Sequence, residues 1–443
     1  MYGYTVVFLR ALMAKNTFTK IMKIKSILLQ YRTILYIISP LILVYTIAIA
    51  IKYKEWRYLR ERLGFYKSTD EKIDIWFHTS SVGEVNSISP LIHELSTRNP
   101  DNRYIITTGT PTGAKLAQKI LPSNVKHYYL PLDFPGATKR FIVRTLPENA
   151  IIMETELWAN LYSYCDSKGI PISIINARLS ERTLTTNSWM YRLYAETLSH
   201  VSKILSRSET DANGFMTIGA TSSKIKVIGN IKFAHIDTSN VGTLPEIQRP
   251  YMLAASTHED EELQLAKLWL KHFSSKLLVI APRHPDRSKK IQSQLKNIAC
   301  DFSVRSKGDV IHDKTNIYLA DTIGEMSKLI NGADAVIMGG SFVPKGGHNV
   351  IEPARLGKLT IFGKSMYNFS NEAELLLNNK ACIQVNGFLD VIDITKKIYD
   401  IPDFKLEYEL NAEKSIKEQN NILERYIDAI NEPCKNYQAN TFL

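Results

Sequence analysis

The stretch ADAVIMGGSFVPKGGHNVIEPARLGK, residues 333–358, decides how we interpret the fold of this chain. Its apolar run from Ala335 to Met338 is typical of a buried parallel strand, because both faces of such a strand are covered. A loop with two adjacent glycines, Gly346 and Gly347, follows this strand, and a helix is predicted from His348 to Gly357. The order of strand, glycine-rich loop and helix is typical of an α/β domain.

This strand, loop and helix start would form an anion site, because free backbone N–H groups and the helix dipole face a bound phosphate. Glycines at 346 and 347 would let the backbone approach a ligand with no Cβ in the way. Glu352 lies one turn into the predicted helix, where its carboxylate can accept hydrogen bonds from paired ribose hydroxyls. The alternative is an ordinary strand-to-helix turn with a solvated Glu352.

Strands and helices alternate along both halves of the chain, which predicts two parallel sheets with helices on both faces. We expect an N-terminal Rossmann-like domain over residues 73–236, a linker over 237–250 and a C-terminal Rossmann-like domain over 251–406. One last polar helix is predicted over 407–431, long enough to cross back over the first domain. The predicted strands are Ile73–His78, Tyr104–Thr107, Lys126–Leu130, Ala150–Met153, Ile172–Ile175 and Lys203–Leu205, then Tyr251–Ala255, Leu277–Ala281, Asn316–Leu319, Ala335–Met338, Leu359–Phe362 and Cys382–Val385.

Charged residues follow several strands of the first half, at the carboxyl edge where ligands bind in such sheets. Glu84 lies in the first turn of a helix, where the dipole favours its ionised form and a carboxylate can act as general base. Glu154 and Glu156 come directly after another strand. Arg178 and Arg207 are expected at the same edge, where arginine suits an acidic substrate. The structural alternatives are a helix-stabilising role for Glu84 and ion pairs between the arginines and the other two glutamates.

The second half carries a similar set of residues after its strands. Arg283 and His284 follow one strand at the ligand edge, and the alternative for Arg283 is an ordinary surface arginine. Neither half contains a G-x-G-x-x-G fingerprint, a P-loop lysine motif, an Asp-x-Asp pair or a metal-binding cluster of histidines or cysteines. Two α/β halves with a cleft between them, and a nucleotide site in the second, indicate a metal-independent sugar-nucleotide transferase.

The net charge of +11 is concentrated at the N-terminus. Residues 1–72 hold 13 Lys and Arg against 4 Asp and Glu, a charge of +9, and the rest of the chain carries only +2. A basic N-terminus beside a nearly neutral body favours an anionic membrane surface over a nucleic-acid partner. The four cysteines stand far apart, which fits a reducing compartment.

An uncharged stretch of 19 residues, Thr33–Ile51, is long enough to cross a bilayer core. We therefore predict a basic extension over 1–32 and a transmembrane anchor over 33–52, with Pro40 as a tolerated kink. A belt of basic and aromatic residues follows the anchor. Two alternatives stay open, a cleaved signal peptide and a helix that lies in the plane of the interface. Met22 is an alternative start of translation.

Ten short motifs of this chain resemble, in order, the 3-deoxy-D-manno-octulosonic acid (Kdo) transferases of lipopolysaccharide synthesis. The resemblance extends over roughly residues 30–430, which makes it far more specific than any single motif. The residues before Met22 depart from the family pattern. The motifs are HTSSVGE, ITTGTPTG, YLPLDFP, METELWANL, INARLSERT, SRSETDANGF, GNIKF, APRHPDR, DTIGEM and GGSFVPKGGHNVIEPA.

The resemblance implies a GT-B fold, with two Rossmann-like domains facing each other across a cleft and an N-terminal membrane helix. It also implies an inverting, metal-independent transfer of Kdo from CMP-Kdo to a lipid A precursor, lipid IVA, with no cofactor. The general base would be Glu84, and Glu154 and Lys232 would stabilise the transition state. CMP contacts are implied at Arg283, His284, Gly324, Glu325, Met326, Asn349, Val350, Ile351 and Glu352.

The implied partners are CMP-Kdo, the lipid A precursor and the membrane, and no nucleic acid is expected. The implied location is the cell inner membrane, with a single-pass N-terminal anchor and the catalytic domains on the cytoplasmic side. Two other functions stay open: another membrane-anchored sugar-nucleotide glycolipid transferase, and a non-enzymatic protein that binds a nucleotide or an anionic lipid. The number of Kdo residues added, the acyl pattern of the acceptor and the oligomeric state do not follow from the sequence.

Overall fold

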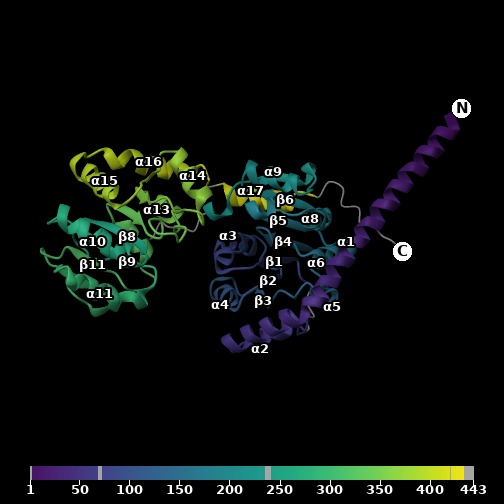
Figure 1. Ribbon diagram of the computed structural model, residues 1–443, viewed down its shortest axis with the longest axis horizontal. Coiled ribbons are helices and arrows are strands. Elements are labelled where there is room, and N and C mark those ends of the chain that lie inside the picture. The colour runs from purple at the N-terminus through teal and green to yellow at the C-terminus, as the bar shows by residue number, and fades with distance from the viewer. Residues whose placement is uncertain (1, 68–71, 235–240, 420, 434–443) are drawn as a thin grey trace. The chain divides into compact units, whose positions relative to one another are not determined.

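The computed structural model of this protein describes residues 2–67, 72–234, 241–419 and 421–433, and its side chains from Ile27 onward except at 181 and 182. The chain forms two compact units (Figure 1). Unit 1 comprises Met1–His235 and Asn421–Leu443, and unit 2 comprises Ile236–Asn420. Each unit is built around its own parallel sheet, which confirms the α/β class expected from the alternating pattern.

The sheet of unit 1 has seven parallel strands in the order β3-β2-β1-β4-β5-β6-β7. Buried isoleucines such as Ile105, Ile152 and Ile174 pack against its helices, as apolar strand runs require. The strand order reverses between β1 and β4, and ligands of such sheets bind at the carboxyl ends of the strands at this switch point. The strands are β1 (Ile75–Thr79), β2 (Tyr104–Thr108), β3 (Val125–Tyr129), β4 (Asn149–Met153), β5 (Ile172–Ala177), β6 (Lys203–Ser206) and β7 (Ile225–Val227).

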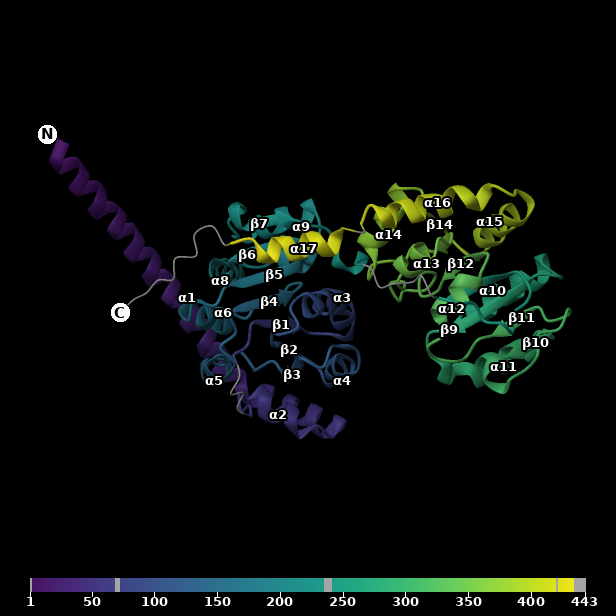
Figure 2. The same cartoon turned by 180° about the vertical axis from the view of Figure 1, so that it is seen from behind.

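Helices cover both faces of this sheet (Figures 1 and 2). The helix α17 (Ile422–Asn431) follows unit 2 in the sequence yet packs against α3 and the 3-10 helix η2 of unit 1, so unit 1 is discontinuous in sequence. The other helices of the sheet region are α3 (Val82–Arg98), α4 (Pro111–Ile120), α5 (Pro135–Thr145), α6 (Ala159–Ser167), α7 (Glu181–Leu184), α8 (Ser188–Ser199), α9 (Glu209–Thr217), η1 (Ser222–Lys224) and η2 (Ile231–Phe233).

Two helices precede the first strand, α1 (Tyr2–Tyr53) and α2 (Trp56–Arg62). The segment Ile27–Tyr53 of α1 is the one helix, among the described residues, that is long and apolar enough to cross a membrane. It runs through Pro40 without a break. Lys54, with a φ of 53°, turns the chain from α1 into α2.

The sheet of unit 2 also has seven parallel strands, in the order β10-β11-β9-β8-β12-β13-β14, and it reverses between β8 and β12. The strands are β8 (Tyr251–Thr257), β9 (Leu277–Pro282), β10 (Phe302–Val304), β11 (Ile317–Leu319), β12 (Ala335–Met338), β13 (Thr360–Phe362) and β14 (Cys382–Gln384). The helices are α10 (Glu261–His272), η3 (Pro285–Arg287), α11 (Ser288–Asn297), η4 (Arg305–Lys307), α12 (Met326–Gly332), α13 (Ile351–Arg355), α14 (Ser370–Asn378), α15 (Phe388–Asp400) and α16 (Phe404–Lys417).

Two strands and one helix break differ from the sequence prediction. The outermost strands β7 and β10 were not predicted, because each has three residues with a polar one in the middle and gives no apolar run. The single helix predicted over 407–431 is divided between α16 and α17. The break contains Gln419 and Asn421, and an Asn side chain competes with the backbone of a helix for hydrogen bonds.

Candidate functional site

The carboxyl end of β1 leads directly into α3, whose first turn holds Glu84. Ser81 caps this helix: its Oγ accepts a hydrogen bond from the Glu84 backbone N–H at 3.3 Å and donates one to Glu84 Oε1 at 2.9 Å. The Ser80 backbone N–H donates to Glu84 Oε2 at 2.7 Å. These reciprocal bonds form a variant of the capping box and fix the carboxylate at the edge of the sheet.

Glu84 is half-buried and lies close to two other carboxylates. Burial is the main cause that raises the pKa of Glu84 to about 7; the fields of Glu154 and Glu156 act in the same direction, and the hydrogen bonds from Ser80 and Ser81 oppose them. A carboxyl group with a pKa near neutrality can take a proton from a hydroxyl at physiological pH. The helix-stabilising alternative also describes this residue, because the same carboxylate completes the cap.

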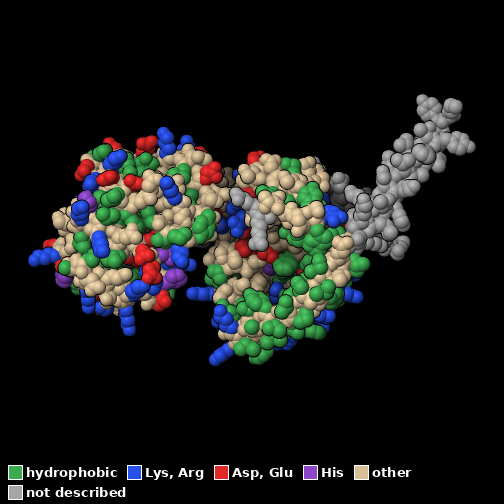
Figure 3. Space-filling model, viewed as in Figure 1, with side chains coloured by type: hydrophobic (Ala, Val, Ile, Leu, Met, Phe, Trp, Pro, Cys, Tyr) green, Lys and Arg blue, Asp and Glu red, His purple; other side chains and the backbone are tan. Residues whose placement is uncertain are grey.

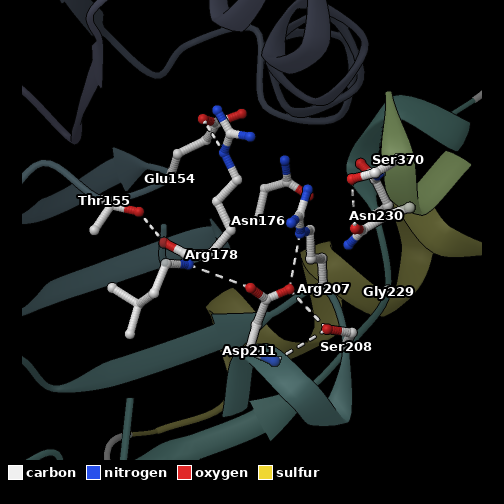
Figure 4. A network of polar contacts seen from close by, with 12 residues as sticks. Glu154, Thr155, Asn176, Arg178, Arg207, Ser208, Asp211, Gly229, Asn230 and Ser370 are labelled. Atoms are coloured by element: carbon white, nitrogen blue, oxygen red, sulfur yellow. Dashed lines mark hydrogen bonds and ion pairs between the residues drawn. The ribbon is translucent and has the colours of Figure 1, made fainter. Parts of the chain in front are cut away.

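Glu154 begins the loop after β4 with a positive φ of 59°, a conformation that non-glycine residues seldom adopt. Its backbone N–H donates to Ile175 O at 2.9 Å, and its Oε2 accepts from Arg178 Nε at 2.6 Å (Figure 4). Thr155 Oγ1 donates to Arg178 O, so this loop and the end of β5 hold each other in place. Backbone strain of this kind persists only where neighbouring contacts impose it, and it clusters at functional sites.

Glu156 lies on the same loop. Burial raises the pKa of Glu156, while hydrogen bonds with Ser80 and Trp158 oppose the shift. Because Ser80 contacts both Glu84 and Glu156, the loops after β1 and β4 meet at the switch point of the sheet. We call Glu84, Glu154 and Glu156 the acidic edge.

Lys232 lies in η2, and contacts from three distant segments fix this short turn. Asn176, whose φ of 48° is also positive, accepts a hydrogen bond through Oδ1 from the Ile231 N–H at 3.1 Å. The Tyr426 hydroxyl on α17 donates to Gly229 O at 2.7 Å and accepts from the Asn176 N–H at 3.2 Å. The turn also packs against α3, the helix that begins near Glu84.

The two arginines expected at this edge are both paired with carboxylates. Arg178 pairs with Glu154, which is the structural alternative considered for it. Arg207 Nε lies 2.8 Å from Asp211 Oδ2, so its partner is a residue of α9 rather than a glutamate of the acidic edge (Figure 4). The positions of these two arginines therefore do not by themselves indicate that either one binds a substrate.

In unit 2 a histidine lies in the loop after each of the two strands at the switch point. His258 Nε2 and His348 Nε2 are 2.9 Å apart, and the two rings are parallel within 5°. At this distance one nitrogen donates and the other accepts, so the pair shares one proton. Burial and, next, the charge of Arg283 lower the pKa of His348 to about 4, which keeps this ring neutral near pH 7.

Positive groups surround this histidine pair. Arg283 and His284 follow β9, and the His284 ring packs edge-on against His258 at 5.9 Å. Lys345 lies in the loop after β12, and its charge contributes to the lowered pKa of His258, for which burial is the main cause. We call Arg283, His284, Lys345, His258 and His348 the cationic edge. Such a group favours an anionic ligand.

A buried glutamate that the sequence analysis did not single out holds the loops of the cationic edge together. Glu261 is 1% exposed. It accepts hydrogen bonds from the backbone N–H groups of His258 and Gly340, both at 2.8 Å, and of Phe342 at 3.2 Å. Its position at the start of a helix is visible in the sequence. Its contacts with Gly340 and Phe342 are not, because these two residues follow β12 and lie 79 and 81 positions away.

The glycine-rich loop after β12 differs from the anion site that the sequence predicts. The helix begins at Ile351 instead of His348 and has only five residues, too few to carry a strong dipole. The loop before the helix is non-helical up to Val350.

The two adjacent glycines of this loop are required by the packing of the chain on itself. A Cβ atom at Gly346 would lie 2.3 Å from the Asn368 side chain, and one at Gly347 would lie 2.2 Å from Met366 Sδ. Both residues also have positive φ, of 85° and 69°. The expectation that they leave room for a ligand is therefore not needed to explain them.

The predicted CMP contacts near α13 differ in whether their side chains or only their backbone atoms can reach a ligand. Val350 and Ile351 are 0% and 1% exposed, so only their backbone atoms can face a ligand. Asn349 has an exposed side chain whose Oδ1 accepts from the Ile351 N–H at 3.0 Å. Glu352 Oε1 accepts from Ser327 Oγ at 2.6 Å. The Glu352 carboxylate is thus oriented by α12 before any ribose could bind it.

The remaining predicted contacts follow β11. Gly324 is exposed, and Glu325 forms an ion pair with Arg305 at 2.8 Å, which lowers the pKa of Glu325. Met326 begins α12, and Ile323, which the sequence analysis did not single out, is 87% exposed. In the part of the chain that the structure describes, no group of three or more His, Cys, Asp and Glu could hold a metal ion.

Known proteins share the sequence and the fold of this chain. Residues 57–235 match the family model of 3-deoxy-D-manno-octulosonic-acid transferase (Kdotransferase). A 3-deoxy-D-manno-octulosonic acid transferase of Haemophilus influenzae is 33% identical, over 82% of this chain and 88% of its own. That of Rickettsia conorii is 32% identical, over 82% of this chain and 80% of its own. The crystal structure of a glycosyltransferase from Rickettsia africae covers 83% of this chain and 100% of its own, with a TM-score of 0.55 at 15% identity. This last likeness and the two seven-stranded sheets confirm the expected GT-B fold.

Proposed function

This chain belongs to the family of Kdo transferases, and from that premise we propose that it transfers Kdo from CMP-Kdo to a hydroxyl group of a lipid A precursor, lipid IVA. The proposal includes inversion at the anomeric carbon and catalysis without a metal ion. The observation that carries it is the Glu84 carboxylate, held by a helix cap at the switch point of unit 1 with its pKa raised to about 7.

In the proposed reaction, the acceptor hydroxyl oxygen forms a bond to the anomeric carbon of Kdo. The bond from that carbon to the phosphate oxygen of CMP breaks, and CMP leaves with the bonding electrons. Glu84 takes the proton of the acceptor hydroxyl. The hydrogen bonds from Ser80 and Ser81 stabilise the ionised form that this step needs, while burial makes the same carboxylate a stronger base.

Positive charge develops on the sugar and negative charge on the phosphate in the transition state, and both need fixed partners. We assign this role to Glu154 and Lys232. The Arg178 ion pair that holds Glu154 supports this assignment, and so do the contacts of Asn176 and Tyr426 that hold the turn of Lys232. Groups fixed before the reaction cost no reorganisation during it.

We assign the donor to unit 2. The cationic edge supplies charge for the CMP phosphate, with Arg283 and His284 as direct contacts and Lys345 as a further cation. Glu352, oriented by Ser327, is the proposed acceptor for the ribose hydroxyls. Val350 and Ile351 would contribute backbone atoms alone. Contacts of Gly324, Glu325, Met326 and Asn349 with CMP stay predictions.

We propose that the enzyme works at the cytoplasmic face of the inner membrane, because its acceptor is an amphiphile and its basic residues are concentrated at the N-terminus. The apolar segment Ile27–Tyr53 is compatible with a membrane anchor. The sequence predicts that this helix crosses the bilayer once. The contacts of α1 with unit 1 favour a different placement of the helix.

Mass spectrometry of the product formed from CMP-Kdo and a tetra-acylated lipid A precursor tests the proposed function. We expect the acceptor to gain the mass of at least one Kdo residue while CMP is released. No Kdo product, with thermal stabilisation by UDP rather than CMP, would favour a different sugar-nucleotide glycolipid transferase. Stabilisation by CMP without transfer from any nucleotide-sugar would favour a binding protein.

A further inference from the structure

The apolar helix α1 contacts the sheet region of unit 1 near both ends of the segment whose side chains are described. One side of this segment is shielded, at positions that recur every three or four residues, as a helix packed along a surface requires. The shielded residues are Ile27, Leu28, Tyr31, Arg32, Leu35, Ser39, Ile42, Thr46, Ile47, Ile49, Ala50 and Tyr53.

The contact at the beginning of this segment includes specific polar bonds. The Tyr31 hydroxyl donates to Asp133 Oδ2 at 2.9 Å, and Arg32 Nε donates to Asn160 Oδ1 at 2.7 Å. Trp189 Nε1 donates to Gln30 Oε1 at 2.9 Å. Polar bonds to three separate elements of unit 1 fix the direction and the register of the helix.

A second contact lies near the end of the same segment. Ala50 is fully buried in an apolar cluster with Tyr58, Ala114 and Tyr129. Tyr31 and Ala50 are 19 positions apart, which is about 28 Å along an α-helix. The two contacts of α1 with the rest of unit 1 are therefore separated by nearly the full thickness of a bilayer core, which is about 30 Å.

The opposite side of α1 is an uncovered apolar face. Ile37, Leu41, Val44 and Tyr45 are 72%, 74%, 66% and 66% exposed. Figure 3 shows hydrophobic side chains gathered along this side of unit 1. The exposed Trp56 and the exposed basic residues Lys52, Lys54 and Arg60 follow this face in the sequence. Aromatic and basic residues beside an apolar face suit the headgroups of an anionic lipid surface.

These contacts are incompatible with a helix that crosses the membrane while it stays docked. An upright α1 would place the part of unit 1 between its contacts with Asp133 and Asn160 at one end and with Ala114 at the other inside the hydrocarbon. Loops of an α/β unit exposed to lipid leave backbone groups without partners, at several kcal/mol each. While α1 stays docked, it can contact a membrane only with its axis parallel to the membrane plane.

We propose that the exposed face of α1 lies in the plane of an anionic membrane surface and that α1 holds unit 1 against this surface without crossing the bilayer. The partner is the lipid bilayer itself, which the apolar face enters to roughly 5–10 Å while the basic residues stay among the headgroups. This placement follows from the packing of α1 and does not depend on the reaction that the enzyme performs.

One consequence rests on the proposed function. The docking partners Asp133 and Asn160 lie in the loop after β3 and at the start of α6, which follows the loop of Glu154 and Glu156. The membrane plane is therefore fixed close to the carboxyl edge of the unit 1 sheet. A glycolipid whose acyl chains stay in the bilayer could present its sugar hydroxyl to Glu84 from that side.

Depth measurements on the full-length protein test this placement. Ile34, Leu41 and Ala48 are all exposed and seven positions apart, so they lie on one side of the helix. Each would be replaced by cysteine and spin-labelled, in a protein with Cys300 and Cys434 changed to serine, on vesicles of phosphatidylethanolamine and phosphatidylglycerol. We expect the same shallow depth at all three sites, within about 10 Å of the headgroups.

A crossing helix gives a different depth profile. The label at Leu41 would then lie near the centre of the bilayer, about 15 Å deep, with the other two labels shallower. That result would overturn the proposal. Labels that no lipid-borne quencher reaches would also overturn it, because a second copy of the chain would then cover this face.

A binding measurement separates this inference from the proposed reaction. The double substitution Leu41→Glu with Val44→Glu should weaken binding to anionic vesicles at least tenfold, since it places two charges in the apolar face. Leu410→Glu is the matched control, because Leu410 is an exposed leucine of α16 in unit 2. Transfer to a detergent-solubilised acceptor should stay unchanged in both variants. Unchanged vesicle binding by the double variant would contradict the membrane placement whatever the enzyme transfers.

Discussion

The carboxyl edges of the two sheets share a topology and carry opposite charge. Each lies where the strand order reverses, between β1 and β4 in unit 1 and between β8 and β12 in unit 2. The acidic edge gathers three glutamates, and the cationic edge gathers an arginine, a lysine and three histidines. The loops after the strands, and not the strands, therefore set the chemistry of each unit.

Burial acts on both edges in the same sense. It raises the pKa of Glu84 to about 7 and lowers that of His348 to about 4, so in each case it disfavours the charged form. Each edge thus holds a titratable group whose neutral form is favoured by burial. In the proposed reaction unit 1 transfers the proton and unit 2 binds the anion, and three experiments test these two roles.

The largest effect is expected at the acidic edge. Glu84→Gln keeps the size of the side chain but cannot take a proton, so we expect kcat for Kdo transfer to fall by roughly 10²–10⁴-fold. The KM for CMP-Kdo should change little, because the donor is assigned to unit 2. Steady-state kinetics measures both constants.

Glu209→Gln is the matched control for this experiment. Glu209 also lies in the first turn of a helix that follows a strand, directly after the cap Ser208, and it is exposed. Its substitution should leave kcat unchanged. Near-normal turnover of Glu84→Gln, or an equal loss in the control, would take the role of general base away from Glu84.

A smaller effect is expected at the cationic edge. Arg283→Ala removes a cation from the group around the histidine pair, and we expect CMP affinity to fall roughly 10–100-fold, as for a lost hydrogen bond to a charged group. Calorimetric titration with CMP measures this change. Lys271→Ala, at an exposed lysine in the last turn of α10, should bind CMP normally. Equal affinities of the two variants would mean that the anion binds elsewhere.

The smallest effect is expected from pH alone, and it separates the two edges. Transfer needs ionised Glu84, so a pKa raised to about 7 predicts that kcat falls as pH drops below 7, by about tenfold per unit. The phosphodiester of CMP-Kdo keeps its charge in this range, and His348, with its pKa near 4, stays neutral. The kcat is therefore to be measured at saturating CMP-Kdo between pH 6 and 8, so that its pH dependence reports on Glu84 and not on binding of the donor. A kcat that does not change over this range would contradict the raised pKa of Glu84.

Most of the fold was predictable because buried parallel strands are apolar on both faces. Runs such as Ala335–Met338 stand out in the sequence and match their strands. The short strands β7 and β10 lack such runs and become strands only because the neighbouring strand offers them hydrogen bonds. Whether such an outer segment forms a strand is decided by tertiary contacts.

The candidate site was predictable where a residue directly follows a strand. Glu154 directly follows β4, and Glu84 lies in the first turn of the helix that follows β1; the structure places both at the switch point. The pairing of His258 with His348 was not predictable, because the two residues are 90 positions apart and meet only through the order of β8 and β12. A packing reason for the adjacent glycines Gly346 and Gly347 was not predictable, because the sequence does not show that Met366 and Asn368 occupy the space beside them.

The hydroxyl of Tyr426 has a consequence for how the protein is made. It anchors the turn that carries Lys232, yet α17 is encoded after the whole of unit 2. A nascent chain on the ribosome therefore lacks this anchor until the whole of unit 2 has been translated. If Lys232 acts as proposed, a chain translated only as far as unit 2 would hold this turn less firmly and would transfer Kdo poorly.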